Sequence, residues 1–445
     1  MEKPLNTILL KGCLVVPVGK EVYGRDLCFE VHTRGRLLVL QAANQEQQAD
    51  WMAAIVNHSR DATIIKQTLK QTIARRPDEP LLDLVDPDRS MPPGAGGPLA
   101  GVESPETAAA SPGLSLRHFT LSNVVGRGGF GKVFRVQHTD SGNFYALKVM
   151  HKERIVMSRQ ATHMMQEKDV MAQISHPFIV NLRATFATQR KLYMVLDFAQ
   201  GGDLTAHMRH GVMPLDITKF VGAELFLALE YLQKLDIVHR DLKPENVFFD
   251  SAGHVKLGDF GLAKISPRSQ RLGSFVGTPE FLAPEILEKK GYGREVDWWA
   301  YGILMYEMLI GETPFSAMRP DAVYMRIKTE SVYYPTKLAD PITDFLKRLL
   351  AREPKQRAGP DEIKAHPFFK GTDWSKLLAL QVKSPLLKKW KSGPLNPDDL
   401  RHFDLSIVYG ERAVDSIALP PPTTGPHAEE LARLADFDWM CEAGL

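Results

Sequence analysis

The chain has 445 residues, enough for two or three domains, and 44% of them are hydrophobic, enough for a sizeable core. A net charge of +2 without a long basic run gives no indication of a nucleic-acid partner. Three widely separated cysteines favour a reducing, cytoplasmic location over a disulfide framework. Neither a signal peptide nor a membrane span is expected: the N-terminal apolar stretch breaks at Gly12 and Pro17, and the longest apolar run, 298–310, contains Glu307.

Residues 1–60 alternate like β-strands (ILLKGCLVVPV, LCFEVHT and RLLVLQA) and then show a helical pattern that contains Trp51. This order resembles the second half of a pleckstrin-homology domain, whose closing helix carries a tryptophan. The first half of that family, with the basic loop for phosphoinositide headgroups, has no counterpart, so lipid binding and membrane recruitment are not carried over. A sequence shortened at its start, a partial domain that packs on the rest of the chain, and an unrelated αβ module remain alternatives.

Residues 61–118 turn to Pro, Gly, Ala and Ser, as in MPPGAGGPLAGVESPETAAASPG. Such a composition cannot bury enough apolar surface to order itself, so we expect a flexible linker. Periodic segments are dense over 119–369, and a tail over 370–445 follows.

A glycine-rich segment, GRGGFGKV, follows the strand-like run FTLSNVV. Glycines let a backbone approach phosphates closely, and the pattern is GxGxxGxV without the GK[ST] ending of a Walker loop. Taken alone, such a cluster is more often an ordinary turn. The residues expected at the phosphates are Gly126, Arg127, Gly128, Gly129, Phe130 and Gly131.

Lys148 stands alone in the apolar strand YALKVM. It could simply extend its amine to solvent, or it could hold the α- and β-phosphates of ATP with a glutamate as its partner. Glu167, in the helical segment MMQEKDVMAQI, is the candidate partner.

The octet HRDLKPEN, followed by DFG at 259–261, provides an acid, a lysine, an amide and a second acid at fixed spacing. Asp241 can orient a hydroxyl and accept its proton, and Lys243 can neutralise a migrating phosphoryl group. Asn246 and Asp259 offer the hard oxygen ligands that magnesium prefers. The pattern predicts phosphoryl transfer from ATP with Mg²⁺.

With these motifs in this order, the chain from about residue 119 onward resembles a serine/threonine protein kinase of the AGC group. The resemblance implies an α+β bilobal fold, with a five-stranded small lobe, a mainly helical large lobe and a C-terminal tail. It also implies a set of adenine contacts, namely Val133, Ala146 and the hinge residues Asp197, Phe198 and Ala199.

The segment GTPEFLAPE, which contains Thr278, resembles the shelf on which this family binds protein substrates. Glu285 is expected to pair with Arg357, and Asp297 to bind the backbone of the catalytic loop. A second group of acids matches positions that bind basic residues in basophilic kinases, namely Asp203, Glu245 and Glu307. Alternatively, Asp203 only caps the helix that begins there.

Ser274 occupies the position of the family's activation-loop phosphate, which an upstream kinase would add. By this resemblance the phosphate would be bound by Arg240, Lys264 and His163. The alternative is an unmodified loop serine.

In the tail, Phe403 in RHFD resembles the tether to the nucleotide, and Ser416 in VDSI resembles the turn phosphorylation site. LADFDW, at 434–439, resembles the closing hydrophobic motif. Leu434 replaces its first aromatic residue, and Asp438 stands where the group often has a phosphorylated residue. We therefore expect Phe437 and Trp439 to dock on the small lobe without phosphorylation. An ordinary amphipathic end is the alternative.

The main hypothesis is an ATP- and magnesium-dependent protein serine/threonine kinase that prefers basic sequences and is regulated by its activation loop and tail. A pseudokinase scaffold and a membrane-recruited adaptor are the rival hypotheses. The motifs do not identify the physiological substrate or the upstream kinase.

Overall fold

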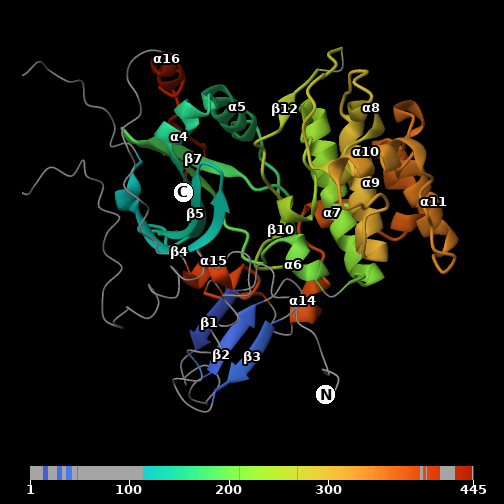
Figure 1. Cartoon of the computed structure of the whole chain (residues 1–445), viewed down its shortest axis with the longest axis horizontal. Helices are drawn as coiled ribbons and strands as arrows, with labels where there is room; N and C mark the ends of the chain where they lie inside the picture. Colours follow the sequence, from blue (N-terminus) through green and yellow to red (C-terminus); the bar gives the residue numbers. More distant parts are fainter. Residues whose placement is uncertain are drawn as a thin grey trace, which may run out of the picture. The chain divides into compact units, whose positions relative to one another are not determined.

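The structure is a computed structural model of the whole chain (Figure 1). It describes residues 14–18, 28–32, 37–42, 48, 114–209, 211–267, 269–390, 394–396, 398–410, 426–442 and 444–445. The chain divides into two units, residues 1–87 with 409–412 and residues 88–408 with 413–445, and each is described by itself.

The first unit contains three antiparallel strands in the order β1, β2, β3. Their bounds are Leu14–Val18, Cys28–His32 and Leu37–Gln41. Phe29 on the central strand is buried. The three strands expected in this region are therefore present, whereas the predicted helix with Trp51 and almost all of the predicted linker lie outside the described residues.

The second unit begins with a small lobe built on one antiparallel sheet, in the order β13, β7, β8, β6, β5, β4. The strands are β4 (Phe119–Gly128), β5 (Gly131–His138), β6 (Phe144–His151), β7 (Leu182–Ala187), β8 (Lys191–Asp197) and β13 (Trp439–Met440). Helices α4 (Lys152–Met157) and α5 (Ala161–Ala172) lie beside it (Figure 1). The five expected strands are present, and the sixth, β13, comes from the tail.

The large lobe is mainly helical. Its helices are α6 (Leu204–Met208), α7 (Leu215–Lys234), α8 (Pro284–Leu287), α9 (Glu295–Ile310), α10 (Pro320–Thr329), α11 (Asp340–Leu349) and α12 (Pro360–Ala365). Helix α9 is apolar on nearly every side, so it lies at the centre of the lobe, with Trp299 fully buried. It ends at Gly311, whose φ of 98° suits a glycine that closes a helix.

Two short antiparallel pairs of strands frame the motifs of the large lobe. They pair β10 (Val247–Phe249) with β11 (Val255–Leu257), and β9 (Ile237–Val238) with β12 (Lys264–Ile265). The octet HRDLKPEN lies between β9 and β10, and DFG lies between β11 and β12.

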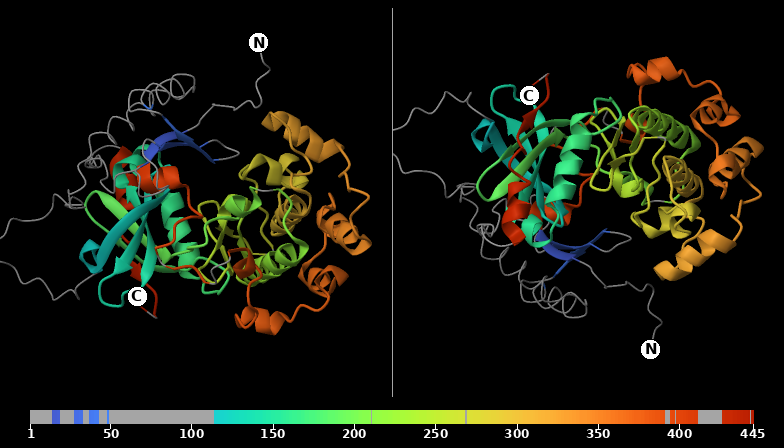
Figure 2. Two further views of the ribbon diagram at one scale, coloured as in Figure 1. Left: turned by 90° about the horizontal axis from the view of Figure 1, so that it is seen from below. Right: turned by 90° about the horizontal axis from the view of Figure 1, so that it is seen from above.

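The tail returns from the large lobe to the small lobe, as the orange and red segments in both views of Figure 2 show. Its helices are α13 (Trp374–Leu378), α14 (Leu386–Trp390), α15 (Leu405–Gly410) and α16 (Pro426–Ala432). Glu430 in α16 accepts a hydrogen bond from the Ala161 backbone N–H at the start of α5, 3.2 Å away. Among the helices that the structure describes, none is both long and apolar enough to cross a membrane.

A buried ion pair joins α8 to the end of the large lobe. Arg357 donates to both carboxylate oxygens of Glu285, at 2.8 and 3.0 Å, and its guanidinium lies 5.2 Å from the centre of the Trp299 ring. Both side chains are almost inaccessible, at 1% and 8% exposure. The pair expected from the sequence is therefore present, and neither charge has water to replace its partner.

Arg357→Ala should lower the free energy of unfolding by about 3–5 kcal/mol, because it leaves the Glu285 carboxylate buried and unpaired. Arg348→Ala is the matched control, since its ion pairs with Asp344 and Glu362 are exposed and should contribute little. Urea unfolding of both variants measures the difference. Equal losses would contradict the role assigned to the buried pair.

Candidate active site

One buried carboxylate, that of Asp297, binds the backbone of the loop HRDLKPEN. Asp297, in the first turn of α9, accepts backbone N–H bonds from His239 at 2.8 Å and Arg240 at 2.9 Å. Burial raises the pKa of Asp297, and the two backbone donors partly offset that effect. Arg240 has a φ of 68°, an uncommon conformation for a residue with a side chain, which these bonds help to maintain.

Asp241 lies at the centre of a hydrogen-bonded group. Lys243 Nζ donates to its Oδ2 at 2.7 Å, and Thr278 Oγ1 donates to its Oδ1 at 2.7 Å. Asn246 Nδ2 donates to its carbonyl oxygen at 2.8 Å. Burial alone would favour the neutral acid, but the bonds from Lys243 and Thr278 lower the pKa of Asp241 below its usual value. Asp241 is therefore a carboxylate at neutral pH.

Lys148 on β6 and Glu167 on α5 form an ion pair, with Nζ 2.7 Å from Oε1. Burial opposes the charge on the lysine, yet Glu167, and more weakly Asp259, raise its pKa overall. Glu167 is buried at 3% exposure. The pair thus presents a fixed positive charge close to the DFG acid.

The donor set beside Asp241 suits a hard divalent cation. Asn246 uses its amide nitrogen in the bond to Asp241, so that bond leaves its amide oxygen available. Asp259 contributes a carboxylate and has a φ of 57°, a strained conformation of the kind found at functional sites. Amide and carboxylate oxygens are ligands that Mg²⁺ accepts, so these residues fit the ion predicted from the sequence.

The strands bring the predicted adenine contacts together. Val133 on β5 is opposite Lys148 on β6, and Ala146 is opposite Leu196 on β8. Phe198 and Ala199 follow directly after β8. The predicted set therefore lies on adjacent strands and on the connection that leaves them.

The carboxylate of Asp197 has a different use from the one expected at a hinge. It accepts hydrogen bonds from Arg183 Nε at 2.7 Å, Asn181 Nδ2 at 2.8 Å and Lys256 Nζ at 3.2 Å. Burial works against its charge, but Lys256 and Arg183 outweigh it and lower the pKa of Asp197. The side chain holds the segment that connects the lobes in place, and the Asp197 backbone N–H donates to the Asn181 carbonyl at 3.1 Å.

The glycine-rich segment forms the turn between β4 and β5, with Gly128 opposite Gly131. A Cβ at Gly131 would collide with the carbonyl oxygen of Val149 on β6, whereas a Cβ at Gly129 would meet nothing within 4 Å. Glycine is thus required at position 131 by the packing of the sheet. At Gly129, where a phosphate contact was predicted, no neighbouring atom requires a glycine.

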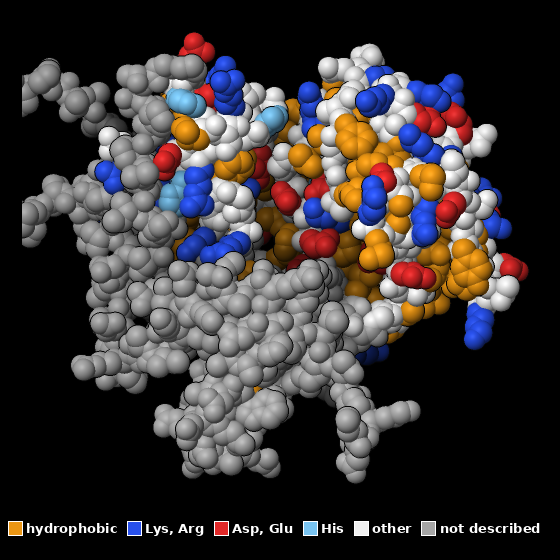
Figure 3. Space-filling view, in the orientation of Figure 1, with side chains coloured by type: hydrophobic (Ala, Val, Ile, Leu, Met, Phe, Trp, Pro, Cys, Tyr) orange, Lys and Arg blue, Asp and Glu red, His pale blue; other side chains and the backbone are white. Residues whose placement is uncertain are grey.

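Acidic side chains gather where the molecular surface is hollowed between the strands and the helices (Figure 3). The pKa of Glu307 is raised to about 7, mainly by burial and also by the negative charges of Glu245 and Glu280. Glu280 accepts a hydrogen bond from Thr313 Oγ1 at 2.5 Å. Glu280 was missed in the sequence, although it lies in the quoted segment GTPEFLAPE.

Asp203 is the N-cap of α6 and accepts a hydrogen bond from the Ala206 N–H at 2.8 Å. Burial raises its pKa, with Glu245 contributing in the same direction. Asp203 therefore caps the helix, and the cap leaves one of its two oxygens outside that bond. Its contact with a basic substrate residue stays a prediction.

Ser274 contacts one of the three cations expected around it. Arg240 Nη1 donates to Ser274 Oγ at 2.7 Å, and the Tyr292 hydroxyl donates to the Ser274 carbonyl at 2.8 Å. Lys264 is exposed and His163 contacts Gln160 instead, so neither touches Ser274 among the described residues. Tyr292 was not foreseen, because no motif marks it.

The end of the tail is docked on the small lobe. Phe437 and Leu434 are fully buried, and Trp439 pairs with Thr185 of β7. Lys168 Nζ donates to the Asp436 carbonyl at 2.8 Å. The smaller Leu434 is thus accommodated without the aromatic residue usual at that position.

Asp438 is exposed beside the docked residues, near Lys152. Burial lowers the pKa of Lys152, and the charge of Asp438 opposes that change. Phe403, further back in the tail, stacks on Phe198 with ring centres 5.6 Å apart. Ser416 lies outside the described residues.

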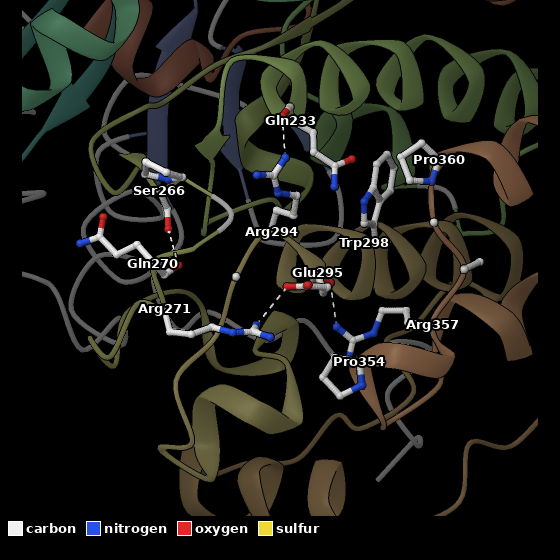
Figure 4. Close-up of a pocket in the computed structure, with 14 residues that line it drawn as sticks. Gln233, Ser266, Gln270, Arg271, Arg294, Glu295, Trp298, Pro354, Arg357 and Pro360 are labelled. Atoms are coloured by element: carbon white, nitrogen blue, oxygen red, sulfur yellow. Dashed lines mark hydrogen bonds and ion pairs between the residues drawn. The ribbon is translucent and has the colours of Figure 1, made fainter.

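A separate pocket of about 330 Å³ opens in the large lobe between 266–271 and the start of α9 (Figure 4). Trp298, Pro354 and Pro360 form apolar parts of its wall, and Arg271 reaches Glu295 at 3.5 Å across it. None of the residues predicted to bind nucleotide lines this pocket.

Two family models match the chain, the protein kinase domain over residues 119–369 and the PH domain over residues 2–60. A probable serine/threonine-protein kinase of Dictyostelium discoideum is 40% identical over 72% of this chain and 70% of its own length. The RAC family serine/threonine-protein kinase homolog of the same organism is 35% identical, over 82% and 74% respectively. Serine/threonine-protein kinase gad8 of Schizosaccharomyces pombe is 42% identical over 68% of this chain and 53% of its own.

Gly131→Ala should lower the free energy of unfolding by about 1–3 kcal/mol, because the added methyl group meets backbone that cannot rotate away. Gly129→Ala, two residues earlier, is the control and should change it by less than about 1 kcal/mol. Thermal or urea unfolding of the two variants gives the comparison. The packing argument fails if the two substitutions are equally tolerated.

Proposed function

The chain belongs to the protein kinase family as an AGC-type serine/threonine kinase, and we propose that Asp241, Lys243 and Asn246 carry its phosphoryl transfer from ATP to a protein hydroxyl. The observation that carries this assignment is the group around Asp241, where one carboxylate receives Lys243 and Thr278 at 2.7 Å each. A substrate serine or threonine hydroxyl that replaces the Thr278 hydroxyl at Oδ1 would donate its proton in the same geometry.

Asp241 orients that hydroxyl and accepts its proton as the oxygen bonds to the γ-phosphorus, while the bond from phosphorus to the β-phosphate oxygen breaks. Lys243 lies within hydrogen-bond distance of both Asp241 and Thr278, so its charge is at the place where the phosphoryl group passes. The main contribution of these residues is position and fixed charge, since phosphoryl transfer needs little covalent help.

Lys148, held by Glu167, binds the α- and β-phosphates, and Gly126 to Gly131 cover them. Asn246 and Asp259 would hold Mg²⁺, which supplies charge neutralisation at the phosphate oxygens. Val133, Ala146 and the hinge backbone at 197–199 would enclose the adenine.

Asp241→Asn should reduce transfer to a serine peptide by about 10²-fold or more, because an amide cannot accept the hydroxyl proton. Its affinity for ATP should change little, since Lys148 and Glu167 are untouched. Labelled ATP with magnesium, using protein phosphorylated at Ser274, measures the first quantity, and nucleotide titration measures the second. Equal transfer by both proteins would exclude the role assigned to Asp241, and no transfer by either protein would favour a scaffold.

The acids around the active site favour substrates with basic residues near the acceptor. Burial is the main cause that raises the pKa of Glu307 to about 7, and the negative charges of Glu245 and Glu280 act in the same direction. A guanidinium bound beside these acids would reduce the repulsion between their negative charges, and it can form bidentate hydrogen bonds with a carboxylate. We therefore assign the recognition of arginine in the substrate to this group.

Glu280→Gln should raise the KM for an arginine-containing peptide about tenfold and leave the KM for its alanine counterpart unchanged. Glu288→Gln, an exposed change on the same lobe, is the control. The preference for arginine should also grow from pH 6 to pH 8, because Glu307 becomes ionised over that interval. An unchanged arginine preference in Glu280→Gln would rule out this subsite.

Regulation is proposed at two places. A phosphate on Ser274 would meet Arg240, whose backbone is fixed by Asp297, and would thereby order the activation loop against the catalytic loop. Docking of Phe437 beside α5 would keep that helix, and so Glu167, in position for Lys148.

Truncation before Leu434 should lower activity several-fold and should also lower thermal stability, because Phe437 leaves a buried site. Asp438→Ala should lower activity less, since one exposed carboxylate is lost. Asp436→Ala serves as the control, because the contact from Lys168 is to the Asp436 backbone. If truncation leaves peptide phosphorylation unchanged, the docked tail has no role in catalysis.

Phosphoinositide recruitment is a second candidate function, favoured by the PH-domain match over residues 2–60. Co-sedimentation of the full chain with liposomes, with and without phosphoinositide, tests it. Binding that depends on the phosphoinositide supports recruitment, and equal binding to both kinds of liposome argues against it.

A further inference from the structure

The tail crosses the large lobe over two consecutive glycines, Gly201 and Gly202, which have no side chains. A Cβ at Gly201 would lie 3.0 Å from the Trp390 ring, and a Cβ at Gly202 would lie 2.8 Å from the Cβ of His402. Gly202 is therefore needed for the tail to lie this close, whereas a Cβ at Gly201 would also lie 2.7 Å from the Cβ of Phe249 in the large lobe itself. The backbone of the tail thus fits closely against these glycines, and His402 lies next to the start of α6.

His402 packs into a cluster of rings at this crossing. Its ring centre lies 4.8 Å from that of His207 on α6 and 5.3 Å from that of Trp390. His207 meets the edge of Phe249 at 5.0 Å, and its Nε2 donates to the Gly201 carbonyl at 2.8 Å. The two imidazoles thus share one largely apolar environment.

The residues on either side of His402 reach the small lobe and the hinge. Phe403 stacks on Phe198 with an angle of 7° between the rings. Asp398 accepts a hydrogen bond from Arg135 Nη2 on β5 at 2.7 Å. His402 therefore anchors a strap, residues 398–403, that connects the two lobes across the hinge.

The charges that face His402 are mostly positive. Lys389 on α14, Arg401 beside it in the tail and Arg209 after α6 all disfavour a proton on its ring. Asp399 favours one, but its carboxylate is paired with Arg401 at 2.5 Å. Buried Nε2 of His402 has no hydrogen-bond partner among the described residues, so a proton placed there would lack an acceptor.

His207 is in a similar position. Its pKa is lowered to about 4, mainly by burial, and the bond to the Gly201 carbonyl offsets only part of that effect. The positive charges of His402, Lys389 and Arg209 contribute to the lowering. For His402, burial comes first among the causes that lower its pKa. Both rings are therefore neutral while the strap is docked.

We propose that His402 makes the docking of residues 398–403 sensitive to pH, so that acidification releases the strap from α6 and frees Phe403 from Phe198. When the strap is released into solvent, His402 regains the usual pKa of about 6.5. The released state therefore binds a proton more tightly than the docked state does. Docking is thus complete above pH 6.5 and weakens as the pH falls below it. Each unit of pH below 6.5, down to the pKa of the docked His402 ring, shifts the balance between released and docked strap by about tenfold.

The test places 4-fluorophenylalanine at position 403 of the full chain and follows its ¹⁹F NMR signal from pH 7.5 to pH 5.5. The readout is structural, so it does not depend on phosphoryl transfer. In the wild type, the ratio of released to docked signal should rise about tenfold over this interval. His402→Gln keeps a polar side chain that does not titrate, and its ratio should change at most a few-fold.

His163→Gln is the matched control, because His163 is exposed on α5 and contacts Gln160 rather than the strap. It should behave like the wild type. If His402→Gln does not fold, titration of the His402 ring by ¹H NMR in the wild type replaces it, and a pKa below 6.5 is expected. A wild-type ratio that stays constant, a slope that survives His402→Gln, or a His402 pKa of 6.5 or higher would each overturn the proposal.

Discussion

The arrangement of the active site depends on the burial of the Asp297 carboxylate beneath the catalytic loop. A buried carboxylate is costly unless donors surround it, and here the donors are the backbone N–H groups of His239 and Arg240. Because they are backbone groups, they fix the chain itself. Asp241 follows directly in sequence, and the Arg240 side chain turns toward Ser274. One carboxylate on a central helix thus positions both the proton acceptor and the residue that senses the activation loop.

The other acids around the active site fall into two groups according to their partners. Asp241 and Asp197 each receive several donors, and their pKa values are lowered although burial opposes their charges. Glu307 and Asp203 lie among other acids, and burial raises their pKa values. Asp241 and Asp197 use their charges to hold the protein's own structure in place. Glu307 and Asp203 have no such set of donors, so a basic substrate residue could lower their electrostatic energy.

Much of the site could be predicted from the sequence because its parts are close in the chain. HRDLKPEN spans a single turn region, so the contacts of Asp241 with Lys243 and Asn246 follow from local spacing. The pair of Lys148 and Glu167 required only a strand followed by a helix. The general order of lobes, hinge and tail came from the resemblance as a whole.

Contacts between distant segments could not be predicted. The structural use of Asp197 depends on Arg183 and Lys256, which approach from other strands. The need for glycine at position 131 depends on Val149 of the next strand, and β13 exists only because the tail meets β7. At Ser274 the resemblance indicated Arg240, Lys264 and His163 as partners of a phosphate, and Arg240 contacts the unmodified serine. The contact with Tyr292 could not be predicted, because Tyr292 belongs to no motif.

The most direct test of this account is the single-turnover rate of phosphoryl transfer in Asp297→Asn, measured with saturating ATP and magnesium. An amide cannot accept both backbone bonds, and losing one charge-assisted bond of about 1.5–3 kcal/mol should slow transfer by about 10- to 100-fold. ATP affinity should remain near the wild-type value, because Lys148 and Glu167 lie on the small lobe. An unchanged transfer rate in a folded Asp297→Asn protein would show that the catalytic loop does not depend on this carboxylate.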